Sequence, residues 1–131
     1  MNFEIPKEKG KAVKIPLVSI KSIVNKTRNN NLTYRMSFNK GVVEMLDLNK
    51  DSKIAFSIEE GGVKFIINPT LEIPTFHLSG RTTNFQCNNV VLIRKILALY
   101  NVEFNVELLF TVKAIEPYKN NIVYKLIKRE D

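Results

Sequence analysis

The residues from Arg35 to Pro69 constrain the fold most, because they combine signals for three strands, a short helix and a tight turn. Apolar and polar side chains alternate in three runs, as they do in half-buried strands: residues 34–38, 53–58 and 63–67. Asn39 offers a side-chain oxygen that can cap a short helix ending near Leu46. The pair Gly61-Gly62, after two glutamates, predicts a hairpin turn that uses positive φ.

The second half of the chain gives a similar series of signals. We expect a strand at residues 81–87, a helix at 89–100 capped by Asn88 or Asn89, a strand at 104–112, a turn at 116–121 and a strand at 122–126. Either this half repeats the first, so that one chain forms both halves of a pseudo-dimer, or similar elements arise independently in an ordinary α+β domain. In both cases the fold class is α+β, mostly antiparallel β, with one short and one longer helix.

We expect one compact domain with three parts: a basic arm at residues 1–14 and two halves at 15–69 and 75–131. Two prolines, Pro69 and Pro74, mark the linker because proline denies pairing in the middle of a strand. The helix at 89–100 is too apolar for a surface position, which leaves Arg94 and Lys95 solvated. The predicted core consists of Phe38, Leu46, Ile54, Phe56, Phe65, Phe85, Ile93, Leu97, Phe104, Val106, Leu108 and Phe110.

Positive charge is concentrated at the ends of the chain. The 131 residues carry a net charge of +7, and residues 1–30 hold seven basic side chains against two acidic ones. Residues 31–112 are balanced, with eight of each sign. A basic arm of this kind favours polyanions and makes their binding dependent on salt. For residues 1–10 alone, a solvated tail is an equally good interpretation.

The strongest cluster surrounds an asparagine-rich connection between two expected strands. Lys26 and Arg28 lie on this loop, and Lys21 and Arg35 lie on its two stems, with no carboxylate among them. We predict that these four cations contact nucleic acid, as two-stranded ribbons do, with help from Lys11 and Lys14 in the arm. The alternatives are chance clustering in a basic protein, or a site formed instead by Lys53, Lys64 and Arg81 on the outward faces of later strands.

Residues 18–69 resemble the swapped-hairpin domain of the SpoVT/AbrB family of bacterial transition-state regulators and antitoxins. The shared pattern is a strand, a basic turn, a strand, a short helix, then a lysine-rich turn leading through Lys53 into a final hairpin, and residues 75–128 are a candidate second copy. The resemblance implies that two halves interlock through their hairpins and that Lys21, Lys26, Arg28 and Arg35 face DNA. The chain lacks the Gly-Arg turn and the helix-opening proline usual in that family, and Asp47 stands where a glycine is common.

Motifs for catalysis and cofactor binding are missing from the sequence. It contains no phosphate-cradling glycine loop and no nucleophile elbow, so we predict a protein that is not an enzyme and uses no cofactor or small-molecule substrate. One cysteine, Cys87, and one histidine, His77, rule out a Cys/His zinc site within one chain. We expect Cys87 to be buried and His77 to be exposed or hydrogen-bonded. Neither a signal peptide nor a membrane span is apparent, which predicts a cytoplasmic protein without membrane contact.

The favoured function is therefore that of a small DNA-binding regulator that contacts duplex DNA. One alternative is a single-strand binder of the positive-cofactor or Whirly type, for which Tyr34, Tyr118 and Tyr124 are candidate stacking platforms. Another is a structural or interaction module of a mobile element or phage. Open sheet edges and the apolar helix also predict a homodimer.

Overall fold

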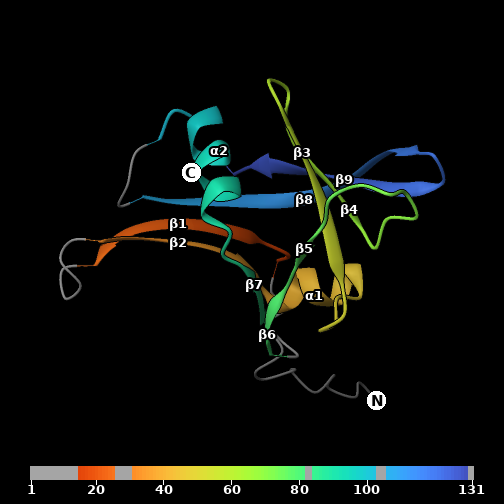
Figure 1. Cartoon of the computed structure of the whole chain (residues 1–131), viewed down its shortest axis with the longest axis horizontal. Helices are drawn as coiled ribbons and strands as arrows, with labels where there is room; N and C mark the ends of the chain where they lie inside the picture. The colour runs from red at the N-terminus through yellow and green to blue at the C-terminus, as the bar shows by residue number, and fades with distance from the viewer. Residues whose placement is uncertain (1–14, 26–30, 82–83, 103–105, 130–131) are drawn as a thin grey trace, which may run out of the picture.

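The computed structural model describes residues 15–25, 31–81, 84–102 and 106–129, which form one antiparallel sheet and two helices (Figure 1). The strands are β1 (Val18–Asn25), β2 (Asn31–Phe38), β3 (Lys53–Glu59), β4 (Gly62–Ile67), β5 (Phe76–His77), β6 (Ser79–Arg81), β7 (Asn84–Cys87), β8 (Val106–Tyr118) and β9 (Asn121–Lys128). The helices are α1 (Lys40–Leu46) and α2 (Val90–Leu99). The expected class, α+β with mainly antiparallel strands and one short and one longer helix, is confirmed.

The sheet is nearly closed into a barrel. Its strand order is β5-β3-β4-β9-β8-β1-β2-β7-β6, so that β5 and β6 stand at its two ends. In the chain these two strands are separated only by Leu78, which is buried. The segment from Phe76 to Arg81 therefore brings the two ends of the sheet together, pairing first with β3 and then with β7.

One face of the sheet, here called the inner face, holds the main core. Its side chains come from most of the strands and include Val18, Ile20, Met36, Phe38, Ile54, Phe65, Phe110 and Leu126. Helix α2 covers this face, contacts β2 and β3, and buries Leu92, Ile93, Ile96 and Leu97. The short helix α1 contacts β2 and β7 and adds Val42, Val43 and Leu46. Because α2 and α1 occupy the inner side, the opposite outer face of the sheet is the side available to ligands.

Both predicted helix caps are confirmed. The Asn39 side-chain oxygen accepts a hydrogen bond from the Val42 amide at 3.0 Å, and the Asn89 oxygen accepts one from the Leu92 amide at 3.0 Å. Asn39 also binds the chain before β1, accepting from the Leu17 amide at 3.0 Å and donating to the Ile15 carbonyl at 2.9 Å. One side chain thus starts α1 and fixes the entry to the sheet.

The predicted core is correct for nine of its twelve members, which are buried: Phe38, Leu46, Ile54, Phe65, Phe85, Ile93, Leu97, Leu108 and Phe110. Phe56 is only partly buried and packs at the edge of the cluster. Phe104 and the Val106 side chain lie outside the described residues. Neither described helix is long and apolar enough to cross a membrane.

Two element boundaries differ from the expectation. The predicted strand at residues 81–87 is a hairpin, β6 and β7, in which Arg81 opposes Asn84. The predicted turn at residues 116–121 is shorter, because β8 continues to Tyr118 through an irregularity in pairing between Ile115 and Tyr118. Pro117 lies in this irregularity, and because it has no amide hydrogen it favours a bulge over regular pairing.

The turn that follows β8 contains only two residues. Lys119 and Asn120 have φ values of 45° and 65°, the left-handed conformation that a two-residue hairpin turn needs. This turn carries no glycine, so the sequence signal was weak and the turn was predicted too long.

Gly80 offers a test of the closure between β6 and β7. It has φ +131°, and a Cβ atom there would collide with the carbonyl oxygen of Asn84 on the paired strand. Gly80→Ala should therefore lower the free energy of unfolding by about 2–4 kcal/mol through backbone strain and overpacking. Urea titration followed by circular dichroism measures this loss.

Gly61→Ala is the matched control, because a Cβ at Gly61 would meet no atom within 4 Å. We expect it to leave the unfolding midpoint nearly unchanged. Equal midpoints for the two variants would show that the conformation of Gly80 does not matter for closure.

Candidate nucleic-acid interface

Two of the predicted site residues come together on the outer face of the sheet. Lys21 on β1 lies directly opposite Arg35 on β2 in the pairing register. Arg35 is exposed, and Lys21 is half-exposed. The alternation of both strands places Ile20, Met36 and Phe38 in the core, so that Lys21 and Arg35 must face outward.

A carboxylate that the sequence did not place here joins this pair. Glu107 on β8 opposes Lys21, and its Oε2 atom lies 2.9 Å from the Lys21 Nζ atom. The two side chains are 42% and 43% exposed, so the ion pair is largely solvated and adds little stability. Lys21 is thus partly neutralised, and Arg35 is the cation of the pair that is open to a ligand.

The other four predicted site residues, Lys11, Lys14, Lys26 and Arg28, lie outside the described residues. Their role in binding remains a prediction from the sequence. Lys26 and Arg28 belong to the segment that connects β1 with β2, next to the strands that carry Lys21 and Arg35.

Three further lysines lie together on the outer face, an arrangement that the sequence did not predict. Lys64 on β4 opposes Lys125 on β9, and Lys125 in turn opposes Lys113 on β8. These three residues are here called the lysine row. Neighbouring strands lie about 4.8 Å apart, so the row spans about 10 Å. Only Lys64 was named from the sequence, as part of an alternative site, because alternation shows that a lysine faces outward but does not show which distant strands are neighbours.

The lysine row is an unfavourable arrangement for the isolated protein. Like charges directly opposite each other on paired strands are destabilising, whereas opposite charges in such positions contribute about 0.2–1 kcal/mol. Within the described part of the chain, none of the three lysines forms an ion pair; the pairs found there are Lys21–Glu107 and Lys40–Glu44. The Lys125 side chain lies close to Gly62: a Cβ atom added at Gly62 would be 3.2 Å from the Cε atom of Lys125.

A hollow of about 730 Å³ adjoins the lysine row on the same face. Its floor includes the side chains of Ala55, Ile66 and Val123, and Lys64 lies on its lining together with Glu59. Ile73 of the loop after β4 and the end of β8 from Ile115 to Tyr118 form its walls. The hollow is therefore mainly apolar, with charged groups at its margin.

Asn121 fixes the wall of this hollow. It is only 6% exposed, and its Oδ1 atom accepts from the Thr70 amide at 3.0 Å. Its Nδ2 atom donates to the Lys119 carbonyl at 2.9 Å and to the Thr70 Oγ1 atom at 3.0 Å. One buried amide thus ties the loop after β4 to the turn between β8 and β9.

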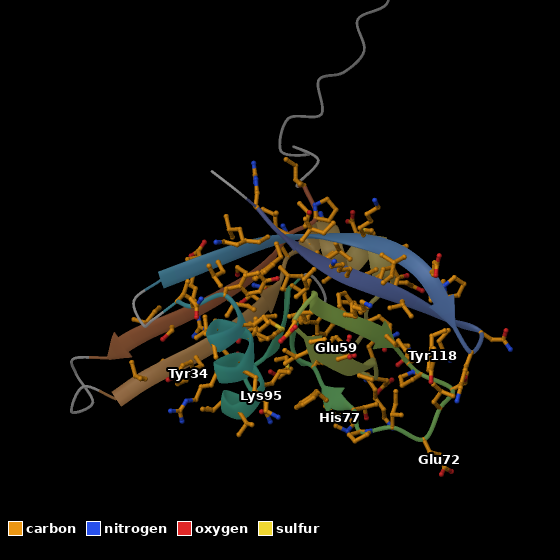
Figure 2. All side chains as sticks on the ribbon, turned by 90° about the horizontal axis from the view of Figure 1, so that it is seen from above. Tyr34, Glu59, Glu72, His77, Lys95 and Tyr118 are labelled. Atoms are coloured by element: carbon orange, nitrogen blue, oxygen red, sulfur yellow. The ribbon has the colours of Figure 1, made fainter. Side chains whose placement is uncertain are left out.

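The three tyrosines considered as stacking platforms differ in position. Tyr34 is partly buried against the core, and Tyr124 stacks on Phe65 with ring centroids 5.5 Å apart. Tyr118 is 52% exposed, and the Lys119 ammonium lies 5.3 Å from the centre of its ring. Figure 2 shows Tyr34 and Tyr118 toward opposite ends of the long axis. Tyr118 is therefore the one of the three that a base can reach.

The structure also places the other residues that the sequence analysis considered for a functional role. Cys87 is buried, and burial raises the pKa of its thiol despite a hydrogen bond with the Asn89 backbone that lowers it, which fits the expected inert side chain. His77 is exposed on β5, as expected, and Arg94 and Lys95 are exposed on α2. Among the described residues, no group of three or more His, Cys, Asp or Glu side chains is placed to hold a metal ion.

Replacing Asn121 tests whether its amide holds the hollow together. Asn121→Ala should lower the free energy of unfolding by about 1–2 kcal/mol, because it removes the side-chain partner of the Thr70 amide and the Lys119 carbonyl. Hydrogen exchange of the Thr70 amide should accelerate more than exchange in β1 and β2. Asn88→Ala, which removes an exposed bond to Gln86, is the control and should change stability by less than about 0.5 kcal/mol. Unchanged exchange at Thr70 would contradict the assignment.

No family model, curated protein or solved structure matches this chain.

Proposed function

We propose that this chain is a non-enzymatic nucleic-acid-binding protein that contacts duplex DNA through the outer face of β1 and β2. The observation that carries the proposal is the position of Lys21 and Arg35, directly opposite each other on the β1–β2 hairpin. β1 pairs with β8 as far as Ser22, and beyond that point the described pairings of the hairpin are between β1 and β2 alone. In the sequence, Lys26 and Arg28 lie on the connection of this hairpin, and Lys11 and Lys14 precede it. A ribbon of two strands fits the major groove of DNA, and cations along it neutralise phosphates.

We further propose that the sheet is a duplicated swapped-hairpin barrel, related in plan to the SpoVT/AbrB domain. The chain contains two runs of two strands, a helix and two strands, namely β1-β2-α1-β3-β4 and the run from the β5–β6 segment through β7, α2 and β8 to β9. The two runs interleave in the strand order, because the β9-β8 hairpin lies between β4 and β1. This interleaving supports the exchange of hairpins between two halves of one chain.

The pairings between the runs support a pseudo-two-fold relation. The second strands of the two runs, β2 and β7, pair with each other, and so do the fourth strands, β4 and β9. The third strand of each run pairs with the first strand of the other: β8 with β1, and β3 with β5. An exchange of the two runs leaves this set of pairings unchanged, as a two-fold axis between them requires.

A homodimer stays a prediction, although the chain itself covers the surfaces that suggested it. Helix α2 buries its apolar side on the inner face, and both ends of the sheet meet at Leu78. A dimer would have to use other apolar groups, such as Val91 on α2, which is 64% exposed. Sedimentation velocity over a range of protein concentrations tests this prediction.

Replacing Arg35 tests the proposed interface. Arg35→Ala should weaken binding to duplex DNA nearly equally across sequences, and it should flatten the dependence of log K on log salt by about 0.9 for one lost phosphate contact. Fluorescence anisotropy with a labelled duplex measures both effects. The additional change of Lys26 and Arg28 to Ala should flatten the slope further.

Lys95→Ala is the matched control, because it removes the same charge from an exposed position on α2, which covers the inner face. The control should keep wild-type affinity and salt dependence. If both variants behave like the wild type, the interface lies elsewhere. If the wild type binds no nucleic acid even at low salt, the functional class itself is wrong, and an interaction module is the better explanation.

Replacing Glu107 should strengthen binding to duplex DNA, whereas replacing Arg35 should weaken it. Because its carboxylate pairs with Lys21, Glu107→Gln removes a negative charge from the interface and frees the lysine ammonium. We expect tighter binding to duplex DNA and a steeper salt dependence, with little change in stability because the ion pair is exposed. Anisotropy titrations at several salt concentrations measure the change. A loss of affinity would show that Glu107 positions Lys21 for binding.

A further inference from the structure

We propose that the lysine row and the adjoining hollow form a second site, which binds a single-stranded segment of nucleic acid. Phosphates lie along Lys64, Lys125 and Lys113, and one unpaired base enters the hollow and stacks on Tyr118. Glu107 and Lys113 are six residues apart on β8, so this site lies about 20 Å along the strand from the ion pair of Lys21. It is therefore separate from the β1–β2 interface.

The charge arrangement is the first argument for an anionic ligand. Three ammonium groups from three neighbouring strands point to one side of the sheet, and no described carboxylate forms an ion pair with them. The three ammonium groups repel one another, and an anion bound between them reduces this repulsion. The row therefore favours an anionic ligand. A row about 10 Å long is a short positively charged track of the kind that follows the backbone of a single strand.

The hollow is the second argument, because it distinguishes a nucleic acid from a simple anion. Lys64 belongs both to the row and to the lining of the hollow, so a chain whose phosphate meets the row has its base next to the hollow. The walls are mainly apolar, Tyr118 is 52% exposed, and Ile73 is 38% exposed. Bases stack on exposed aromatic rings with little dependence on sequence.

Two carboxylates on the lining of the hollow favour the base of a nucleotide there over its phosphate. Glu59 and Glu116 line the hollow from β3 and β8, and their carboxylates repel phosphate. A carboxylate accepts hydrogen bonds from N–H groups on the pairing edge of a base, such as the amino group of cytosine or the ring N–H of thymine. Only an unpaired base exposes its ring face and this edge together, which is why the ligand is a single strand and not a duplex.

This inference shares with the proposed function only the class of ligand. Duplex binding at β1 and β2 and single-strand binding at the lysine row use different residues, so that each can fail alone. A wild-type protein that binds duplex DNA but not a single strand would overturn the second site and leave the proposed function intact.

The test uses the full chain and a short labelled oligothymidylate in fluorescence anisotropy. Changing all three lysines of the row to Thr should weaken binding at least about tenfold at low salt and flatten the salt slope by about two units. The same variant should keep the wild-type affinity for duplex DNA. Its melting temperature should be equal or higher at low salt, because three like charges have been removed, so weaker binding cannot be ascribed to unfolding.

Tyr118 provides the second arm of the test. Tyr118→Ala should weaken oligothymidylate binding by about five- to 150-fold, the range for a stacked base, whereas Tyr118→Phe keeps the ring and the affinity. The chain contains four tyrosines and no tryptophan, so quenching of tyrosine fluorescence by the oligonucleotide reports stacking directly. Tyr118→Phe should reduce this quenching without reducing affinity.

Three results would overturn the proposal. One is an unchanged affinity and salt slope in the triple lysine variant. Another is an equal loss of affinity in Lys95→Ala, which would show that only net charge matters. The third is an affinity in Tyr118→Ala that matches Tyr118→Phe, which would leave a surface that binds polyanions, acidic peptides included, without a base in the hollow.

Discussion

The structure depends on the segment from Phe76 to Arg81, because it joins the two ends of the sheet. Its first residues pair with β3 and its last residues with β7, while Leu78 between them points into the core. If the nine-stranded sheet were open, the backbone donors and acceptors of its two edge strands would be unpaired. Since one residue separates β5 from β6, the two ends cannot move apart without breaking the pairing of one of them. Closure therefore couples the first and second halves of the chain.

Closure also decides which surface remains for binding. With α2 and α1 packed on the inner side, ligands can reach the outer face of β4, β9, β8, β1 and β2, although Ile66 and Val123 on this face are buried in the hollow. The long strand β8 runs across the face from Glu107 to Tyr118. Asn39 at one place and Asn121 at another fix the segments that border this face, each through several hydrogen bonds to backbone groups. The backbone that carries the outward side chains is therefore rigid, which limits the conformational entropy that the protein loses when a ligand binds.

Local patterns in the sequence predicted the local structure well. Alternation placed Met36, Phe38 and Ile54 inside. Asn39 was identified as a helix cap, and the second cap was narrowed to Asn88 or Asn89, because such side chains satisfy amides next to them in the chain. The bulge at Pro117 was missed, and the turn at Lys119 and Asn120 was predicted too long, since neither has a strong local signal. The lysine row and the closure at Leu78 depend on which distant strands become neighbours, and one sequence does not contain that register. For the same reason Lys21 and Arg35 were predicted together, on adjacent strands of one hairpin, but Glu107 was not.

Magnitudes explain how the sheet tolerates three opposed lysines. Interactions between solvent-exposed charges change stability by no more than about 1 kcal/mol per pair, whereas burying one large apolar side chain contributes about 1.5–3 kcal/mol. On the strands that carry the row, Phe65 and Leu126 are almost fully buried on the opposite face, and Tyr124 stacks on Phe65. The inner face therefore more than offsets the repulsion on the outer face. The two faces of a strand alternate residue by residue, so the charge on one face can change without a change in the packing on the other. The outer face can therefore carry residues that serve binding without loss of core packing.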